Sequence, residues 1–218
     1  MKAITQLYSH KLPQDFYLQE KVAVIAKSLL GKVLVSFFDG QLTAGRIVET
    51  EAYNGVMDKA SHAWGGRRTS RTETMYAPGG ISYVYLCYGI HHLFNVVTNQ
   101  AEIPHAILIR GIEPILGKDI MMQRTGKTES DVSVSRGPGN VSKAMGIKTS
   151  HDGISLHGKT LFIADDGYSL TKSKIIATPR IGVDYAGEDA LLPYRFIVKD
   201  NSYVSGNHWQ IKKPEKSQ

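Results

Sequence analysis

The chain has 218 residues, of which 42% are hydrophobic, so it can bury one sizeable core and does not require two domains. Its formal net charge of +6 favours an anionic partner such as a nucleic acid over an acidic small metabolite. The sequence lacks any run of roughly 18 apolar residues that would span a bilayer, and residues 1–12 contain no apolar segment typical of a signal peptide.

We therefore expect a single cytoplasmic domain over residues 1–218 that makes no membrane contact, and a polar, disordered tail at 212–218. A prokaryotic source would add association with the nucleoid. The single cysteine, Cys87, excludes an internal disulfide and a cysteine-rich zinc site.

The N-terminal part predicts a helix followed by a long β-hairpin. Apolar residues at helical spacing predict the helix over 18–30. Strands over 32–38 and 41–53 flank Asp39-Gly40, a sequence typical of a two-residue turn. Alternation along the second strand predicts two faces. One face would hold Ile47, Glu49, Glu51 and Tyr53, and the other Val48, Thr50 and Ala52.

Residues 54–80 predict a long loop rich in Gly, Ser, Thr and Arg, and such loops often carry function. Two glycines precede its arginines, so the backbone can approach a phosphate chain closely. His62 is a candidate for hydrogen bonding to a substrate, although a structural histidine fits the pattern equally well. The candidate phosphate-binding residues are Arg67, Arg68 and Arg71.

A second hairpin is predicted from strands over 81–88 and 93–98. Tyr83 and Tyr85 would share a face and stack against a base, which contributes about 1–3 kcal/mol per base. Tyr88 would lie at the turn, where an aromatic ring can wedge into a base stack. Asn95 would face away from its apolar neighbours and read a base edge from a pocket wall.

The remaining elements complete an α+β fold. A strand over 106–112 carries Arg110, which can pair with a carboxylate or orient an active-site group. Helices are predicted over 118–124 and from an Asn140 N-cap to Met145, whose free N–H groups suit a phosphate. Further strands are predicted over 159–164, 175–177 and 195–199. We expect a single domain with a curved, mostly antiparallel sheet or open barrel and peripheral helices.

Glu51 is the candidate catalytic carboxylate. Cleavage of a purine–sugar bond needs a positioned water and stabilisation of an oxocarbenium-like transition state, and a carboxylate supplies both. A salt bridge from Glu51 to Arg46 or Arg110 is the structural alternative. Other functions that remain open are a sugar-polymer hydrolase using Glu49 with Glu51, a noncatalytic nucleic-acid module, and a metalloenzyme. The metalloenzyme would use His62, His91, His92 and His105, which lack a recognised ligand spacing.

Four segments together resemble the alkyladenine (3-methyladenine, methylpurine) DNA glycosylase family. They are residues 46–55, which begin RIVETEAY, 62–71, 79–95, which contain YVYLCYG, and 107–114. The motif PRIGVDYAG at 179–187 extends the likeness toward the C-terminus, so that it covers about residues 29–206. The family's fold is similar to a formyltransferase C-terminal domain.

The resemblance implies a monomer that acts on double-stranded DNA containing damaged purines, without a metal or organic cofactor. Glu51 would activate the water, and His62 and Arg110 would order the active site. Tyr53, His62 and Tyr85 would sandwich the extruded base, and Asn95 would disfavour normal guanine. The residues that would contact DNA are Tyr88 as intercalator, Arg67, Arg68, Arg71 and His91.

Two departures from the family pattern concern DNA contacts and leave the catalytic set unchanged. His91 and His92 stand where bulkier apolar or aromatic residues are expected, and the helix start at Asn140 varies. N-alkylation makes a purine cationic, which improves it as a leaving group and as a partner for tyrosine rings. Neutral lesions such as hypoxanthine would need a general acid, which the sequence does not identify.

Overall fold

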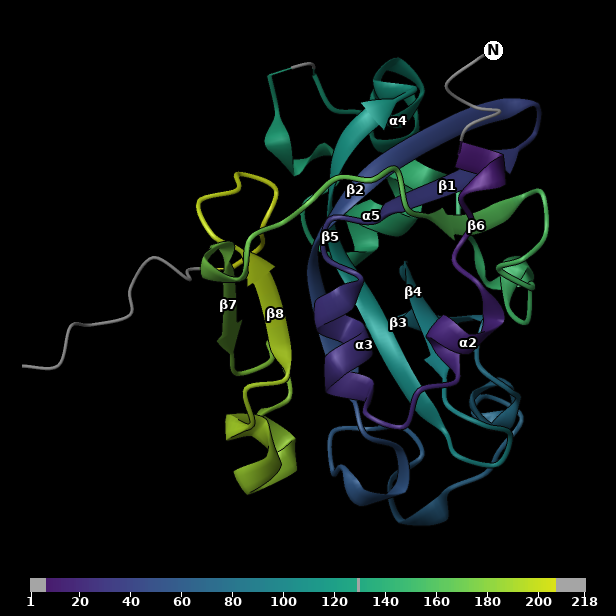
Figure 1. The fold of residues 1–218 in the computed structure, drawn as a ribbon, viewed down its shortest axis with the longest axis vertical. Helices are drawn as coiled ribbons and strands as arrows, with labels where there is room; N and C mark the ends of the chain where they lie inside the picture. Colours follow the sequence, from purple (N-terminus) through teal and green to yellow (C-terminus); the bar gives the residue numbers. More distant parts are fainter. Residues whose placement is uncertain (1–6, 129, 207–218) are drawn as a thin grey trace, which may run out of the picture.

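Eight strands form one twisted antiparallel sheet that does not close into a barrel (Figure 1). The computed structural model describes residues 7–128 and 130–206, so the tail expected at 212–218 lies outside them. The strand order is β3-β4-β5-β2-β1-β6, and β8 joins β2 to β7. The strands are β1 Val33–Phe38, β2 Gln41–Tyr53, β3 Ser82–Cys87, β4 His91–Thr98, β5 His105–Leu116, β6 Leu161–Ala164, β7 Ile175–Thr178 and β8 Arg195–Val198.

The longest strand, β2, connects the parts of this sheet. Its first half pairs with β1 through the predicted turn, where Asp39 and Gly40 have φ of 53° and 71°, and glycine and aspartate tolerate this conformation. Its second half pairs with β8 on the same edge, while β5 occupies the other edge. The strands predicted over 159–164 and 175–177 exist as β6, which pairs with β1, and β7, which pairs with β8.

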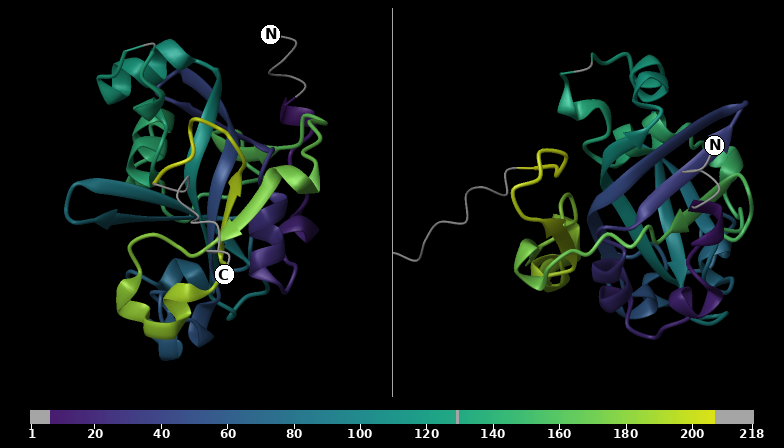
Figure 2. Two further views of the ribbon diagram at one scale, coloured as in Figure 1. Left: turned by 90° about the vertical axis from the view of Figure 1, so that its left-hand side faces the viewer. Right: turned by 45° about the horizontal axis from the view of Figure 1, so that its top comes forward.

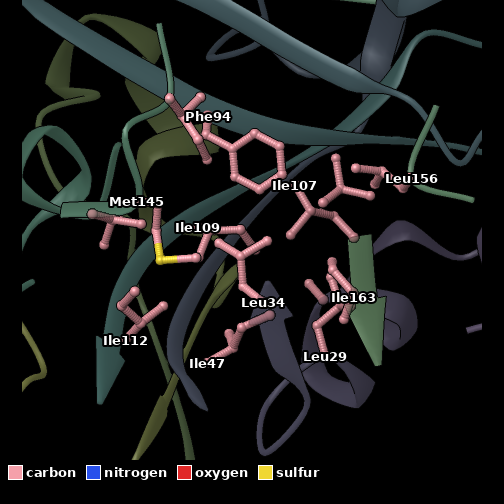
Figure 3. Close-up of a cluster of buried hydrophobic side chains, with 14 of the residues drawn as sticks. Leu29, Leu34, Ile47, Phe94, Ile107, Ile109, Ile112, Met145, Leu156 and Ile163 are labelled. Carbon is pink, nitrogen blue, oxygen red and sulfur yellow. The ribbon is translucent and has the colours of Figure 1, made fainter. Parts of the chain in front are cut away.

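The main core lies on the sheet face that two helices cover, and Figure 3 shows strand and helix side chains meeting there. Three fully buried side chains pack against this face: Ile25 of α3 (Val22–Ser28), Leu29 directly after that helix, and Met145 of α5 (Pro138–Met145). The helix predicted over 18–30 is shorter and is preceded by a separate helical turn. The helices are α2 Gln14–Tyr17, α3 Val22–Ser28, α4 Lys118–Thr125 and α5 Pro138–Met145.

The predicted faces of β2 are wrong at two positions. Ile47 lies in the main core (Figure 3), which also contains Ala52. Val48 packs instead in a small cluster with Ile197 on the opposite face. The cause is an irregularity in the pairing of β2 with β5 near Glu49. A β-bulge breaks the period of two that the prediction assumed.

The start of α5 also differs from the prediction. Asn140 lies inside the helix and donates from Nδ2 to the carbonyl of Arg136, so it is not the N-cap. Gly137 occupies that position with φ of 89°, and Pro138 follows at the first helical position, where its fixed φ suits a helix start.

The predicted loop at 54–80 folds around three short 3-10 turns, at Gly55–Met57, Trp64–Gly66 and Glu73–Tyr76. The hairpin of β3 and β4 projects from the body of the molecule, as the left view of Figure 2 shows. In residues 7–128 and 130–206, the structure contains no helix with the length and apolar character needed to cross a bilayer.

Candidate active site

A cavity of about 640 Å³ lies on the sheet face opposite the main core. Side chains from β2, β3, β4 and β5 reach it because alternation turns every second residue of those strands to this face. The structure brings together eight of the predicted site residues as cavity lining: Tyr53, His62, Arg71, Tyr85, Tyr88, His91, Asn95 and Arg110.

Glu51 lies directly behind this lining and has no exposed surface. Its Oε2 accepts hydrogen bonds from the Tyr53 hydroxyl at 2.9 Å and from Arg110 Nη1 at 3.3 Å. Its Oε1 accepts from the backbone N–H of Ile181 at 2.8 Å. All three donors line the cavity. The three residues that hold the Glu51 carboxylate therefore lie between it and the cavity.

Burial raises the pKa of Glu51, because a carboxylate loses hydration in this position. Arg110, the Ile181 N–H and the Tyr53 hydroxyl oppose that shift by stabilising the charged form. A carboxylate with a raised pKa is a stronger base than an exposed one, which suits it to remove a proton from water.

Glu49 is committed to structural contacts. Its Oε1 accepts from Arg195 Nε at 2.7 Å and Arg110 Nε at 3.1 Å, and its Oε2 accepts from the Ser205 N–H at 2.6 Å. Arg110 therefore bridges Glu49 and Glu51. Because both Glu49 oxygens are occupied and the residue is fully buried, the structure gives no support to a sugar hydrolase with Glu49 and Glu51 as its pair.

Aromatic rings form one side of the cavity. The ring centroids of His62 and Tyr85 lie 4.6 Å apart at 74°, and His62 Nδ1 is 2.9 Å from the Tyr83 hydroxyl. Burial lowers the pKa of His62 to about 4, and Arg71 and Arg67 contribute to this shift. His62 is thus neutral at pH 7, and its edge contact with Tyr85 makes the two rings part of a single wall.

Asn95 enters the cavity wall from β4 with its amide group fixed. Nδ2 donates to the carbonyl of Tyr83 at 3.2 Å and to the carbonyl of Leu93 at 3.3 Å. Both amide hydrogens are used in this way, so Oδ1 is the polar atom left to meet a base. The prediction that Asn95 lies in a pocket wall is confirmed.

The predicted arginines of the loop separate in the structure. Arg71 lies over the Tyr85 ring at 4.8 Å and lines the cavity. Arg68 pairs with Glu73 and Glu102 and is not among the lining residues. Arg67, which precedes Arg68 in the chain, is exposed. Their contacts with DNA stay predictions.

Tyr88 lies in the turn of the projecting hairpin and is 90% exposed. The register pairs Cys87 with His91, so Tyr88, Gly89 and Ile90 form the turn. Tyr88 has φ of 51°, a left-handed conformation that bulky residues seldom adopt. An apolar ring is thus held in solvent beside the cavity that it helps to line.

The segment 180–183 contributes contacts at the site that the sequence motif at 179–187 does not predict residue by residue. Arg180 forms a fully buried ion pair with Asp58 and lies over the Tyr53 ring at 4.9 Å. The next residue, Ile181, gives its N–H to Glu51. Local sequence carries little sign of this arrangement, because Asp58 and Arg180 are 122 positions apart.

Within the described ranges, no three His, Cys, Asp or Glu side chains gather in a way that could hold a metal ion. The histidines considered above for a metal, His62, His91, His92 and His105, form no such group.

Comparison with known proteins gives one consistent family. The Methylpurine-DNA glycosylase (MPG) family profile matches residues 15–202. A protein named "Putative 3-methyladenine DNA glycosylase" from Chlamydia abortus is 45% identical over 86% of this chain and 97% of its own length. Proteins of the same name from Bdellovibrio bacteriovorus and Desulfitobacterium hafniense are 43% and 42% identical, each over 89% of this chain and 98% of its own length.

These matches span nearly all of the region that forms the sheet and the cavity. They confirm the resemblance that the motifs around Glu51 and Tyr85 predicted. The chain therefore belongs to the methylpurine-DNA glycosylase family and is a DNA glycosylase, a hydrolase of N-glycosyl bonds.

Proposed function

We propose that this enzyme extrudes damaged purines from double-stranded DNA and hydrolyses their glycosidic bond with a water activated by Glu51, leaving an abasic site. The observation that carries the proposal is the position of Glu51. A fully buried carboxylate with a raised pKa is held by three groups that line an aromatic cavity of base-binding size.

The hydrogen bonds of Glu51 leave one acceptor position for that water. An ionised carboxylate offers about four acceptor positions, and Tyr53, Arg110 and Ile181 occupy three. We place the attacking water at the remaining position, where it donates its proton to Glu51 as its oxygen attacks the sugar carbon. Arg110 holds the carboxylate in orientation, and Glu49 fixes Arg110.

The substrate class follows from the chemistry of the wall. Tyr53 on one side and the His62–Tyr85 pair on the other would stack against a purine, with Tyr88 filling the gap in the duplex. Because the wall carries tyrosine rings and a neutral imidazole, it suits cationic 3-methyladenine and 7-methylguanine. Hypoxanthine and etheno-adenine complete the proposed class.

The cavity also supports a monofunctional enzyme in base excision repair. An enzyme that cuts the strand as well would use an amine nucleophile, and no lysine is among the residues that line the described cavity. We also propose that the enzyme acts as a monomer.

An excision assay tests this function. Duplexes that carry one alkylated, deaminated or etheno purine are incubated with the enzyme in chelator, then analysed with and without hot alkali. We expect abasic sites that break only after alkali. Intact duplex with every lesion would refute the proposal, and breakage without alkali would refute its monofunctional part.

A further inference from the structure

A second cavity, of about 450 Å³, lies next to the base cavity. His91 and Gly139 line both, so they form the partition between the two. A Cβ on Gly139 would lie 3.0 Å from His91 Nδ1, which shows how closely α5 and β4 meet there. We call this second cavity the basic groove.

Cations predominate in the basic groove. Arg124 of α4, Lys143 of α5 and Lys148 line it together with His91 and His92. Asp39 is the one acidic residue among its lining residues, and in the part of the chain that the structure describes no ion pair involves the three cations. Three Lys or Arg side chains against one carboxylate leave the groove with a net positive charge, which attracts an anion, so the groove suits a polyanionic ligand.

Hydrogen bonds to the backbone fix the donors of this groove. His92 Nδ1 accepts from the Thr149 N–H at 3.2 Å, so its proton is on Nε2, which remains a donor. Nδ1 of His151 accepts from the Lys148 N–H at 3.1 Å, and the His151 ring stacks on Phe38 at 3.9 Å. These contacts hold Lys148 in place beside His92.

The hairpin turn relates the two cavities. Tyr88 lines the base cavity and Ile90, which is 71% exposed, lines the basic groove. The two apolar side chains of one three-residue turn therefore belong to different cavities. A duplex entered by this turn would present its extruded nucleotide on one side and continuous backbone on the other.

We propose that the basic groove is a second phosphate site, which binds phosphodiester groups of the duplex while the base cavity holds the extruded nucleotide. The inference rests on the proposed function for the placement of the hairpin. The shared chemistry is the phosphodiester, from either the lesion strand or the complementary strand. Two adjacent cavities would thereby position the duplex about the turn.

The test replaces two exposed cations of the groove, as K143Q/K148Q, and compares them with K172Q/K174Q. Lys172 and Lys174 are also exposed and line neither cavity, so the control removes the same charge. Binding to damaged and undamaged duplex is measured from 50 to 200 mM salt. Each phosphate contact contributes about 0.9 to the slope of log affinity against log salt.

We expect K143Q/K148Q to reduce the magnitude of that slope by about 2. Between 50 and 200 mM salt, the factor by which its affinity falls should therefore be about 10-fold smaller than the wild-type factor. The K172Q/K174Q control should keep both the wild-type slope and the wild-type rate of single-turnover excision. Equal slopes for wild type and K143Q/K148Q, or an equal loss in the control, would overturn the proposal.

Uncharged methylphosphonate linkages then identify the strand. They are placed opposite the hairpin on the lesion strand in one duplex and on the complementary strand in another. If wild type and K143Q/K148Q bind one of these duplexes equally, the groove binds the phosphates of the strand that was substituted in it. A difference between the two proteins that persists in both duplexes contradicts the site. Binding to undamaged duplex tests the groove without any excision. A result against the groove can therefore be distinguished from a result against the proposed activity.

Discussion

The backbone N–H of Ile181 donates a hydrogen bond to Oε1 of Glu51 over 2.8 Å, although 130 positions separate the two residues. The bond links the segment after β7 to the strand that carries the candidate base. It favours the charged carboxylate against the burial that raises its pKa. The chemistry proposed for β2 thus depends on a segment from the other end of the chain.

Glu51→Gln should abolish most excision and keep lesion binding. Removal of a general base costs about 10²–10⁴-fold in rate, whereas the stacking wall stays in place. Single-turnover excision and equilibrium binding to a lesion duplex measure the two effects. Glu188→Gln, at an exposed glutamate, is the matched control. Excision by Glu51→Gln at the wild-type rate would remove Glu51 from the mechanism.

Excision of an alkylated purine should depend on pH through the same carboxylate. Because burial raises the pKa of Glu51, the active charged form should be lost as pH falls, at a pH above the usual value for glutamate. Single-turnover rates at saturating enzyme give the profile. A rate that stays flat down to the ordinary glutamate pKa would contradict the raised value.

Tyr88→Ala should slow extrusion of the base without loss of stability. The side chain is 90% exposed, so its removal costs little packing, but the duplex loses its wedge. We expect about a 10-fold lower excision rate, corresponding to about 1.4 kcal/mol, and weaker fluorescence of 2-aminopurine placed beside the lesion. Tyr88→Phe keeps the ring and should behave as wild type; equal defects in both variants would argue against a wedge.

His62 should make the folded state less stable at low pH. Its folded pKa is about 4, below the unfolded value near 6.5, so the unfolded chain binds more protons between these values. Stability is therefore complete above about pH 6.5 and falls toward pH 4, by about 1–3 kcal/mol. Denaturant unfolding of wild type and His62→Gln at pH 7 and pH 5 measures the loss. The variant should lose less, and parallel losses would be inconsistent with a buried neutral imidazole.

Asp58→Asn should destabilise the enzyme by about 3 kcal/mol, because it leaves the buried Arg180 guanidinium without its charge partner. The double variant Asp58→Leu with Arg180→Met removes both charges and should recover much of that stability. The double variant should nevertheless have low activity, because Arg180 contacts Tyr53 and precedes Ile181, whose N–H binds Glu51. Thermal unfolding and single-turnover excision separate the two effects, and full activity in the double variant would exclude a positioning role.

Most of the site was predictable because its residues follow local periods. Alternation in the second hairpin correctly placed Tyr83, Tyr85 and Asn95 on the cavity face. The turn residues Asp39 and Gly40 marked the first hairpin. Such features depend on neighbours in sequence, which is why they can be recognised without the fold.

The rest depends on contacts between distant segments. The Asp58–Arg180 pair and the pairing of β8 with the second half of β2 have no local pattern. The burial of Glu51 behind its donors is likewise a property of packing. The prediction for Ile47 was wrong because alternation was extended through an irregularity that leaves no period in the sequence.

Gly111 shows what that irregularity requires of the neighbouring strand. A Cβ at this position would lie 2.6 Å from the Tyr203 carbonyl oxygen and 3.2 Å from the Glu49 Cβ. Any larger residue would force the Tyr203 backbone to shift and would crowd Glu49, which holds Arg110 beside the candidate base. An engineer who wished to rebuild the specificity of this enzyme would be free to vary the aromatic wall, but would have to retain a glycine that touches no nucleotide.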